Sequence, residues 1–247
     1  NELATTYNEM SMQLYEEENI RTEFIATLSH EIRTPLSSIH ESVSMIAEEV
    51  FGPVNEKQKK FLKIASIEIK RINELLKHLL SVSVLESGTR KKQSRKINTK
   101  DLVLSSTEIF ASFAEKKSVS LHINGLKNCP ELYGVKEELQ QIFINIIGNA
   151  IKFSPENSSV TVSYQKDKVR NWLLFRVTDT GPGIPEEELS LVFTKYYRTK
   201  QAIGHLDGVG LGLAIARKIV MSYGGQIKVV NNQNQGVTFS FTLPTKG

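Results

Sequence analysis

The chain has 247 residues, a net charge of +4 and one cysteine, Cys129. This length gives room for one large domain or two small domains. The mild charge, without a basic stripe interleaved with aromatic residues, excludes nucleic acid as a partner. One cysteine excludes an internal disulfide and fits a reducing compartment. Neither a signal peptide nor a membrane-spanning apolar run is found, so we expect a soluble piece, which can be cut from something longer.

Residues 1–28 carry apolar side chains that step by alternating fours and threes, interrupted by polar Glu17 and Arg21. This heptad spacing predicts a parallel coiled coil and therefore a homodimer. The alternative is an amphipathic helix packed within one chain, since few heptads are present. We assign residues 1–19 to a coiled-coil signalling linker. The apolar seam consists of Leu3, Tyr7, Met10, Leu14, Phe24 and Leu28.

The stretch FIATLSHEIRTPL, residues 24–36, continues as a helix with one apolar stripe. His30 lies off this stripe, and its neighbours Ser29 and Glu31 are expected to face water. The ring of Pro35 would clash with the Glu31 carbonyl, which predicts a bend beside the histidine. A lone histidine is usually a surface residue, and the other histidines keep that interpretation. His30 is given a functional interpretation only if the chain also contains a nucleotide site.

The first helix is expected to run to about Phe51 and to break at residues 52–53, Gly-Pro. Asn55 and Gln58 then form a capping box that starts a second helix over about residues 56–85. Two long helices joined by a short loop make an antiparallel hairpin. One hairpin is too narrow to bury both apolar stripes, so we expect two copies to form a four-helix bundle.

Residues 89–100 contain six basic residues and almost no apolar ones. We interpret this stretch as an interdomain linker with a short strand, and we place the linker proper at residues 89–95. Helices and strands alternate from residue 101 onward, which predicts an α+β two-layer sandwich. The expected helices are 101–117, 136–153 and 212–222, and the expected strands are 119–123, 159–164, 172–179, 226–231 and 236–243.

The helix 136–153 contains NIIGNAIKFSP, in which Asn145 and Asn149 lie one turn apart on the same face. Buried amides on an apolar helix are costly without partners, so these side chains predict a ligand. Amide oxygens can complete the shell of a magnesium ion that phosphates already hold. Lys152 is close enough to offer a cation to the same phosphates. A satisfied polar network in the core is the alternative.

The stretch DTGPGIP, residues 179–185, ends an apolar strand and begins a loop. Gly181 and Gly183 allow the backbone to approach a ligand closely. Asp179 is an acceptor that suits an exocyclic amino group such as that of adenine. The loop therefore predicts a binding site for a nucleotide base.

A second glycine run, GVGLGLAIA, places Gly208, Gly210 and Gly212 at the start of a helix, where backbone N–H groups form a seat for phosphates. The glycines follow a polar loop, which excludes the Rossmann pattern, and Gly-Lys-Ser/Thr is absent, which excludes a P-loop. Residues 191–207 between the two glycine runs combine aromatic and basic side chains, among them Arg198. This composition predicts a mobile lid, with a disordered surface loop as the alternative.

The motifs SHEIRTPL, NIIGNAIKFSP, DTGPGIP, VFTKYYRT and GVGLGLAIA, in this order, resemble the H, N, G1, F and G2 boxes of bacterial sensor histidine kinases with the commonest class of dimerisation domain. The resemblance implies a dimerisation and phosphotransfer hairpin at residues 20–88. It also implies an ATP-binding catalytic domain at residues 96–247, with the fold shared by gyrase and Hsp90. The expected fold is thus multidomain: an all-α hairpin that forms a dimeric four-helix bundle, followed by an α+β two-layer Bergerat sandwich.

The resemblance also implies roles for single residues. His30 corresponds to the phosphoacceptor, Glu31 to the adjacent general base, and Thr34 to the residue that positions water when the enzyme dephosphorylates its partner. The other positions form the nucleotide site: Asn149 as magnesium ligand with Asn145 in the companion position, Lys152 on the phosphates, Asp179 on adenine, Arg198 as the F-box arginine, and Gly181, Gly183, Gly208, Gly210 and Gly212 as the nucleotide-loop glycines.

The implied activity is Mg-ATP-dependent autophosphorylation of His30, followed by phosphotransfer to an aspartate on the receiver domain of a response regulator. Phosphatase activity toward that regulator is also expected. The stretch NELATTYNEM, residues 1–10, resembles the tail of a HAMP signalling module, which usually follows a transmembrane helix. We therefore expect the cytoplasmic portion of a bacterial inner-membrane receptor, connected to the membrane only through a missing N-terminal sensor region.

Two alternatives stay open from the sequence. An ATPase of the gyrase or Hsp90 type would explain residues 136–216 but would leave SHEIRTPL without a purpose. A degenerate kinase that senses nucleotide as a dimeric interaction module is disfavoured, because His30, both asparagines and the glycines are intact.

Overall fold

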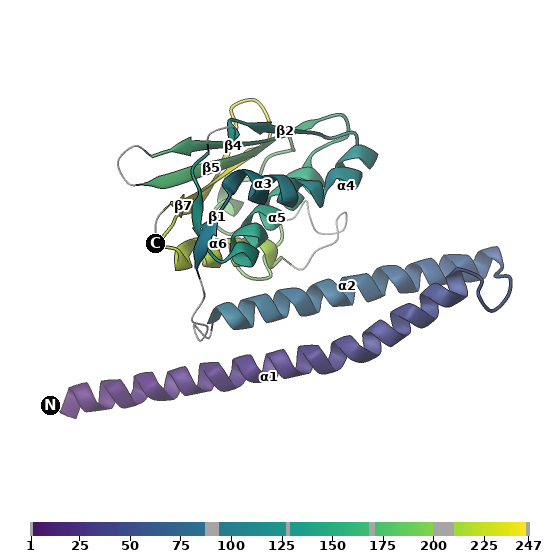
Figure 1. Ribbon diagram of the computed structural model, residues 1–247, viewed down its shortest axis with the longest axis horizontal. Helices are drawn as coiled ribbons and strands as arrows, with labels where there is room; N and C mark the ends of the chain where they lie inside the picture. The colour runs from purple at the N-terminus through teal and green to yellow at the C-terminus, as the bar shows by residue number, and fades with distance from the viewer. Residues whose placement is uncertain (1, 87–93, 127–128, 168–170, 200–209, 246–247) are drawn as a thin grey trace. The chain divides into compact units, whose positions relative to one another are not determined.

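The computed structural model describes residues 2–86, 94–126, 129–167, 171–199 and 210–245. The chain divides into two compact units, Asn1–Arg90 and Lys91–Gly247 (Figure 1). The first is helical and the second combines helices with a sheet, so the predicted order of a helical region and an α+β sandwich is confirmed. The boundaries at residues 19, 88 and 95 stay predictions.

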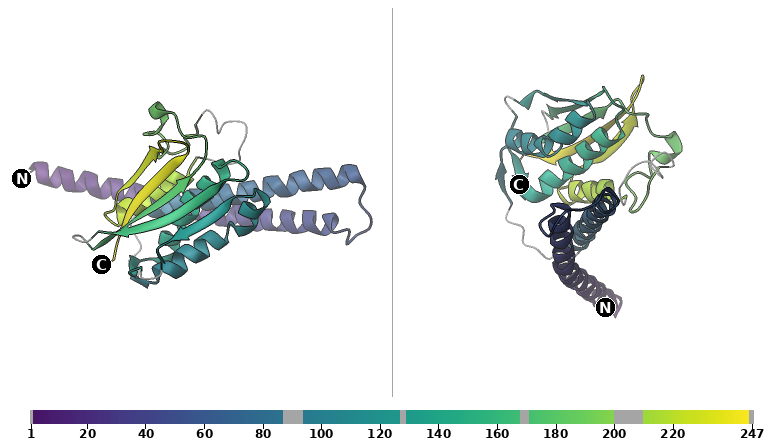
Figure 2. Two further views of the ribbon diagram at one scale, coloured as in Figure 1. Left: turned by 90° about the horizontal axis from the view of Figure 1, so that it is seen from above. Right: turned by 90° about the vertical axis from the view of Figure 1, so that its right-hand side faces the viewer.

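The helical unit is a hairpin of α1 (Glu2–Ala47) and α2 (Glu56–Glu86). α1 stays helical through Pro35 and is visibly bent along its length (Figures 1 and 2), as expected for a helix with an internal proline. Among the side chains that the structure describes, the core between the helices consists of Leu36, Ile69 and Leu76, with Val43 packed against them.

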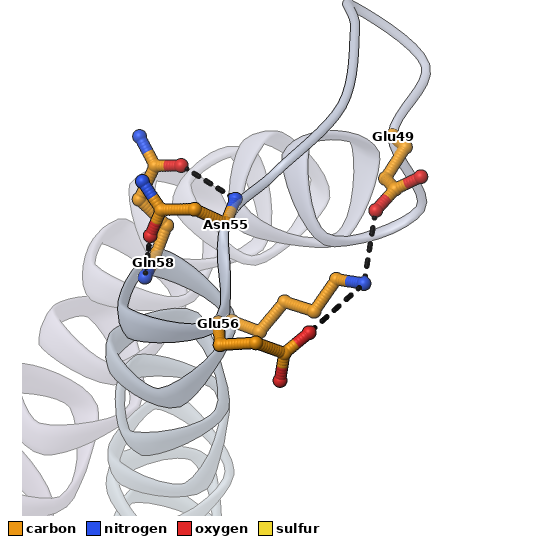
Figure 3. A network of polar contacts seen from close by, with 5 residues as sticks. Glu49, Asn55, Glu56 and Gln58 are labelled. Atoms are coloured by element: carbon orange, nitrogen blue, oxygen red, sulfur yellow. Dashed lines mark hydrogen bonds and ion pairs between the residues drawn. The ribbon is translucent and has the colours of Figure 1, made fainter.

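The sequence predicts that the first helix runs to about Phe51, but α1 ends at Ala47. The reason is Glu49, whose φ of 60° is left-handed and cannot continue a helix. Lys59 holds this turn through ion pairs with Glu49 at 3.1 Å and with Glu56 at 3.7 Å (Figure 3). The hydrogen bond between Glu49 and Lys59 lowers the pKa of Glu49 and raises the pKa of Lys59.

The capping box predicted at the start of α2 is present (Figure 3). The backbone N–H of Gln58 donates to Asn55 Oδ1, and the backbone N–H of Asn55 donates to Gln58 Oε1, both at 2.9 Å. The two bonds satisfy N–H groups that have no partner within the helix.

The second unit contains four helices and seven strands among its described residues. The helices are α3 (Thr99–Glu108), α4 (Ala111–Lys116), α5 (Lys136–Phe153) and α6 (Gly212–Ser222). The strands are β1 (Arg95–Ile97), β2 (Ser120–Asn124), β3 (Leu132–Gly134), β4 (Ser159–Lys166), β5 (Trp172–Asp179), β6 (Ile227–Asn231) and β7 (Val237–Pro244).

These elements form two layers. The main sheet has the strand order β2-β4-β5-β7-β6, in which only the β2–β4 pair is parallel. α5 packs against β4 and β5 and against α3 and α6, so that the helices cover one face of the sheet (Figures 1 and 2). β1 pairs with β3 in a separate antiparallel ribbon, which confirms the short strand predicted in the basic linker.

Two details of the second unit differ from the sequence prediction. The predicted helix 101–117 is divided into α3 and α4, because the hydroxyl groups of Ser105, Ser106 and Thr107 donate to carbonyls of the preceding turn and compete with helical bonding. β3 was not predicted. Leu132 is the one fully buried apolar side chain of this strand, and a strand of three residues is too short to show a periodicity in the sequence.

The core of the sandwich is an aromatic cluster between α5 and the sheet. The ring of Phe143 stands edge-on to Phe175 and Phe241, with centroid distances of 5.1 and 5.2 Å. All three side chains are fully buried. Inward and outward side chains alternate along β5, and Asp179 is the last inward position. A carboxylate therefore stands at the end of an apolar row.

Tyr223, which follows α6, joins the end of this helix to the start of α5. Its hydroxyl accepts a hydrogen bond from the Val135 N–H and donates to Glu138 Oε2, each at 2.9 Å. Gly134 makes room for the ring, because a Cβ there would lie 2.8 Å from a ring carbon of Tyr223. The two helices that carry the N and G2 boxes are thus fixed to one another.

Replacement of Asn55 by Ala should lower the free energy of unfolding of the helical unit by about 1 kcal/mol, because the first turn of α2 loses its cap. Chemical denaturation of the chain, followed by helical circular dichroism, measures this change. Glu56→Gln is the control, since its exposed side chain makes only a long ion pair. Equal stability of Asn55→Ala and the control would contradict the capping argument.

Candidate functional site

The polar side chains predicted for the N box lie on one face of α5. Asn145 is 8% exposed, while Asn149 and Lys152 are partly exposed. Gln141 Nε2 donates to Asn145 Oδ1 at 2.9 Å, and Asn145 Nδ2 is buried without a hydrogen-bond partner among the described residues. An unpartnered buried donor costs about 1–3 kcal/mol. This face of α5 therefore fits a ligand that carries acceptor oxygens.

Lys117, which the sequence reasoning missed, caps the C-terminal end of α5. Its Nζ donates to the carbonyl oxygens of Ile151 at 3.2 Å and Lys152 at 2.7 Å. Burial lowers the pKa of Lys117. A cation here satisfies carbonyls that lack helical partners and complements the helix dipole. The helical turn that carries Lys152 is held in place as a result.

The Asp179 carboxylate is the most buried acidic group of the predicted site, at 3% exposure. Its Oδ1 accepts hydrogen bonds from the backbone N–H groups of Gly181 at 2.9 Å and Val237 at 3.2 Å. Burial raises the pKa of this carboxyl, and the two hydrogen bonds oppose the rise. Because both of these bonds go to Oδ1, Oδ2 is the oxygen that can accept a hydrogen bond from an amino group of a ligand.

The G1 loop lies directly against the end of α5. A Cβ at Gly181 would stand 3.0 Å from Asp179 Oδ1 and 3.1 Å from the Phe153 carbonyl oxygen, so the close approach requires glycine. Gly183 has a φ of 83°, a left-handed conformation that favours glycine. The structure thus brings the G1 glycines and the N-box helix together.

Two asparagines, Asn231 at the end of β6 and Asn232 after it, hold both ends of the G1 loop, and the sequence reasoning did not single them out. Asn231 accepts a hydrogen bond from the Ile184 N–H at 2.9 Å and donates to the Ile184 carbonyl at 2.7 Å. Asn232 donates to the Asp179 carbonyl at 3.1 Å. In the sequence Asn231 ends a predicted strand and Asn232 begins the following turn, and nothing there indicates contact with residues 179–185.

The G2 box begins α6 and contacts the F box. Leu211 precedes the helix and has no polar side chain that could cap it, which leaves the first N–H groups open to an anion. The Gly210 carbonyl accepts a hydrogen bond from the Tyr196 N–H at 3.0 Å. Gly210 has a φ of 73°, and a Cβ there would lie 2.6 Å from the Tyr197 carbonyl oxygen. The G2 box therefore lies directly against the F-box residues Tyr196 and Tyr197.

Other predicted residues are described only in part. Gly208 and residues 200–207 of the predicted lid lie outside the described residues, and Arg198 is partly exposed. His30 lies within α1, and its side chain is also outside the described part. Glu31 and Thr34 are exposed, whereas Ser29 is fully buried, so the expectation that Ser29 faces water is wrong.

A shallow polar cleft lies elsewhere on the second unit. It is lined by residues of β2, the loop after α5 and the β6–β7 turn, among them Ser120, His122, Asn157 and Gln235. Ser120 and His122 point to the face of the sheet opposite to Asp179, because side chains alternate along each strand. The cleft therefore opens toward the other face of the sheet, although Pro155 and Thr180, which belong to the N-box and G1 stretches, also line it.

A mixed sheet with one helical layer, a buried carboxylate at a strand end and two glycine loops beside an amide-bearing helix defines an ATP-binding domain of the Bergerat type. Comparisons with known proteins agree. Residues 134–247 match the family model "Histidine kinase-, DNA gyrase B-, and HSP90-like ATPase", and residues 20–88 match the "His Kinase A (phospho-acceptor) domain". Together the two matches cover well over half of the chain. The chain belongs to the histidine kinase family.

Individual relatives support this assignment. The sensor histidine kinase WalK of Bacillus subtilis is 32% identical, with 99% of this chain and 39% of the relative covered. The circadian input-output histidine kinase CikA of Synechococcus elongatus is 31% identical, with 90% and 30% covered. The crystal structure of full-length ShkA in complex with AMPPNP has the same fold, with a TM-score of 0.75 and 24% identity over 90% of this chain and 45% of ShkA. The chain spans less than half of these relatives.

Gly210→Ala and Gly212→Ala should differ in their effect. A Cβ at Gly210 meets backbone atoms in a left-handed conformation, so we expect the free energy of unfolding to fall by about 2 kcal/mol or more. At Gly212 the nearest atom, Asn145 Oδ1, is 3.4 Å away, so we expect a change within about 0.5 kcal/mol. Thermal unfolding of the two variants measures this. Equal destabilisation would contradict the direct contact between the F and G2 boxes.

Asp179→Asn should weaken ATP binding at least about tenfold, because a charged acceptor is lost. The same change should stabilise the free protein at neutral pH. The folded-state pKa of Asp179 is raised above its ordinary value of 3.8, so its contribution to stability is full below that value and is lost as the pH rises through the raised pKa. Denaturation at pH 3 and pH 7, with calorimetric ATP titration, measures both effects. A variant less stable than wild type at pH 7 would contradict the burial argument.

Proposed function

We propose that the chain is the catalytic part of a sensor histidine kinase that transfers the γ-phosphoryl group of Mg-ATP to His30. The observation that carries the proposal is the buried, unpartnered amide of Asn145, which lies on α5 beside the G2 box in a chain that also contains SHEIRTPL. A site that binds acceptor oxygens would hold the triphosphate of ATP, and the phosphoacceptor motif would supply the histidine that receives its phosphoryl group.

The nucleotide is proposed to bind around α5. Asp179 would accept a hydrogen bond from the adenine amino group, and the glycines of the G1 and G2 boxes would allow the backbone to approach the ligand. Lys152, Arg198 and the N–H groups at the start of α6 would contact the phosphates. The contact between Gly210 and Tyr196–Tyr197 would hold the F box beside the G2 box.

A magnesium ion is proposed to bind through Asn149, with Asn145 in the companion position. The described residues contain no group of three or more His, Cys, Asp or Glu side chains that could hold a metal ion, so the ion would rely on amide oxygens, phosphates and water. When bound, it would neutralise charge on the triphosphate and favour phosphoryl transfer. The partly exposed Asn149 offers an amide oxygen for the ion, one helical turn from Asn145.

The transfer step uses residues of α1. A neutral imidazole, with an ordinary pKa of about 6.5, is a competent nucleophile near pH 7. Its nitrogen lone pair forms the N–P bond, the bond from the γ-phosphorus to the bridging oxygen breaks, and ADP leaves. Glu31, exposed and adjacent, would accept the ring proton. The exposed Thr34 would align water when the enzyme dephosphorylates its partner.

The partners proposed are a second copy of the chain and the receiver domain of a response regulator. The hairpin supports the first, because many of the large apolar side chains whose burial is described stay exposed on both helices. Two hairpins can bury these side chains as a four-helix bundle. The exposed residues include Phe24, Leu28, Ile32, Ile39 and Ile46 of α1 and Phe61, Ile64, Ile67 and Ile72 of α2.

A receptor context is also proposed, as the cytoplasmic portion of a bacterial inner-membrane protein. The apolar heptads of residues 1–28 and the greater length of the relatives support a preceding input region. No helix among the described residues is long and apolar enough to cross a bilayer. A coiled coil entering α1 would transmit the signal by repacking the bundle.

Phosphoryl transfer to His30 can be tested with γ-labelled ATP and magnesium. We expect acid-labile, base-stable label on the wild-type chain and none on His30→Gln, because only an imidazole nitrogen forms this phosphoramidate. His40→Gln, on the same helix, is the matched control and should keep the label. Label on His30→Gln would contradict the assignment. ATP hydrolysis without any label would favour the gyrase-type ATPase.

Ile39→Glu should weaken self-association of the chain about tenfold or more. Ile39 is 52% exposed in the single hairpin, and burial of an isoleucine side chain contributes about 1.5–3 kcal/mol. Sedimentation equilibrium of the variant measures the dissociation constant. Glu41→Gln, an exposed change nearby, is the control. A monomeric wild-type chain, or an unaffected Ile39→Glu dimer, would contradict the proposed bundle.

A further inference from the structure

We infer that Gln141 is a positioning residue that orients the Asn145 amide, so that Asn145 donates a hydrogen bond to a phosphate oxygen of the nucleotide and does not ligate the metal. This inference rests on the proposed nucleotide site and divides the work of the two asparagines. Asn149 is left to supply the amide oxygen for the ion.

The geometry on α5 carries this assignment. Gln141 and Asn145 are four residues apart, which places their side chains together on one helix face. Gln141 Nε2 donates to Asn145 Oδ1 at 2.9 Å. A carboxamide has one acceptor oxygen and one donor nitrogen. With the oxygen turned toward Gln141, the opposite side of the Asn145 amide presents N–H groups.

Because Asn145 is buried, the orientation of its amide determines which ligand atom it can bind. Asn145 is 8% exposed, and its Nδ2 is buried without a hydrogen-bond partner in the described part of the chain. A buried N–H group requires an acceptor. Magnesium is held by oxygen and cannot bind an amide nitrogen that carries hydrogens. The unsatisfied atom of Asn145 therefore calls for a ligand oxygen.

The surroundings of the amide favour the same ligand. Gly212, the first residue of α6, lies against it: a Cβ there would be 3.4 Å from Asn145 Oδ1 and 3.5 Å from Asn145 Cγ. The N–H groups at this helix start are donors as well, and the preceding Leu211 side chain cannot cap them. Asn145 Nδ2 and the start of α6 thus form one set of donors, which suits a phosphate.

Two substitutions of Gln141 separate the possible amide orientations. Lysine can only donate, so Gln141→Lys would keep Asn145 Oδ1 turned toward position 141. Glutamate can only accept, so Gln141→Glu would attract Asn145 Nδ2 and turn the oxygen toward the ligand. Gln141 is partly exposed, so either charged group can be accommodated. Gln140→Lys and Gln140→Glu are matched controls that add the same charges one residue away.

The experiment is calorimetric titration of the full chain with ADP, once with magnesium and once with EDTA. After the charge effect seen at position 140 is subtracted, we expect Gln141→Lys to bind within about threefold of wild type. Gln141→Glu should bind about tenfold more weakly in both conditions. Melting temperatures without ADP should be equal for the two Gln141 variants, which separates positioning from a loss of fold.

The Asn145→Asp variant tests independently whether Asn145 donates to a phosphate or ligates the metal. A metal-ligating side chain would keep or strengthen magnesium-dependent ADP binding when its amide becomes a carboxylate. A donor to phosphate loses its hydrogens and gains a repulsive charge, so we expect at least about a tenfold loss with magnesium and with EDTA.

Equal corrected affinities of the two Gln141 variants would overturn the inference, as would an Asn145→Asp variant that binds Mg-ADP as tightly as wild type. Neither result would affect the proposed function. A wild-type chain that fails to bind ADP with magnesium would instead overturn the proposed function itself.

Discussion

Burial of one carboxylate, that of Asp179, is the constraint on which the nucleotide-binding unit depends. An ionised carboxylate in a core is strongly unfavourable unless donors surround it. Here the donors are backbone N–H groups of Gly181 and Val237, so the chain must pass within hydrogen-bond distance on two sides. Gly236 extends the same constraint, because a Cβ at that position would collide with the Asp179 carbonyl. The buried charge lowers stability at neutral pH, because burial raises the pKa of this carboxyl.

The helical unit depends on a different constraint, the shortage of core within one hairpin. Among the hairpin side chains that the structure describes, the buried apolar ones are Leu36, Ile69 and Leu76, while large apolar side chains on both helices stay exposed. Hydrophobic burial is the main favourable contribution to folding, so a single hairpin of this kind is only marginally stable. A second copy would supply the missing burial. Changes in the dimer would then alter the helix that carries His30, which links assembly to activity.

The sequence predicts the local features of this chain well and the long-range ones poorly. The bounds of α5 and α6 and the capping box at Asn55 follow from periodicity, glycine positions and side-chain chemistry within a few residues. Lys117, by contrast, bonds to carbonyls more than thirty residues away, and no spacing indicates this. Asn231 and its contact with the G1 loop are equally hidden. Contacts between distant segments depend on tertiary structure, which periodicity does not encode.

The central claim is that nucleotide binds where α5 meets the two glycine loops, in a chain that holds its own phosphoacceptor. The most direct test is an NMR titration of the labelled full chain with Mg-ADP. The account predicts that the largest amide shift changes occur at Asp179, Gly181, Asn149 and Gly212, around the C-terminal half of α5. Changes concentrated instead at Ser120, His122 and Asn157 would place the ligand in the cleft on the other face of the sheet and contradict the account.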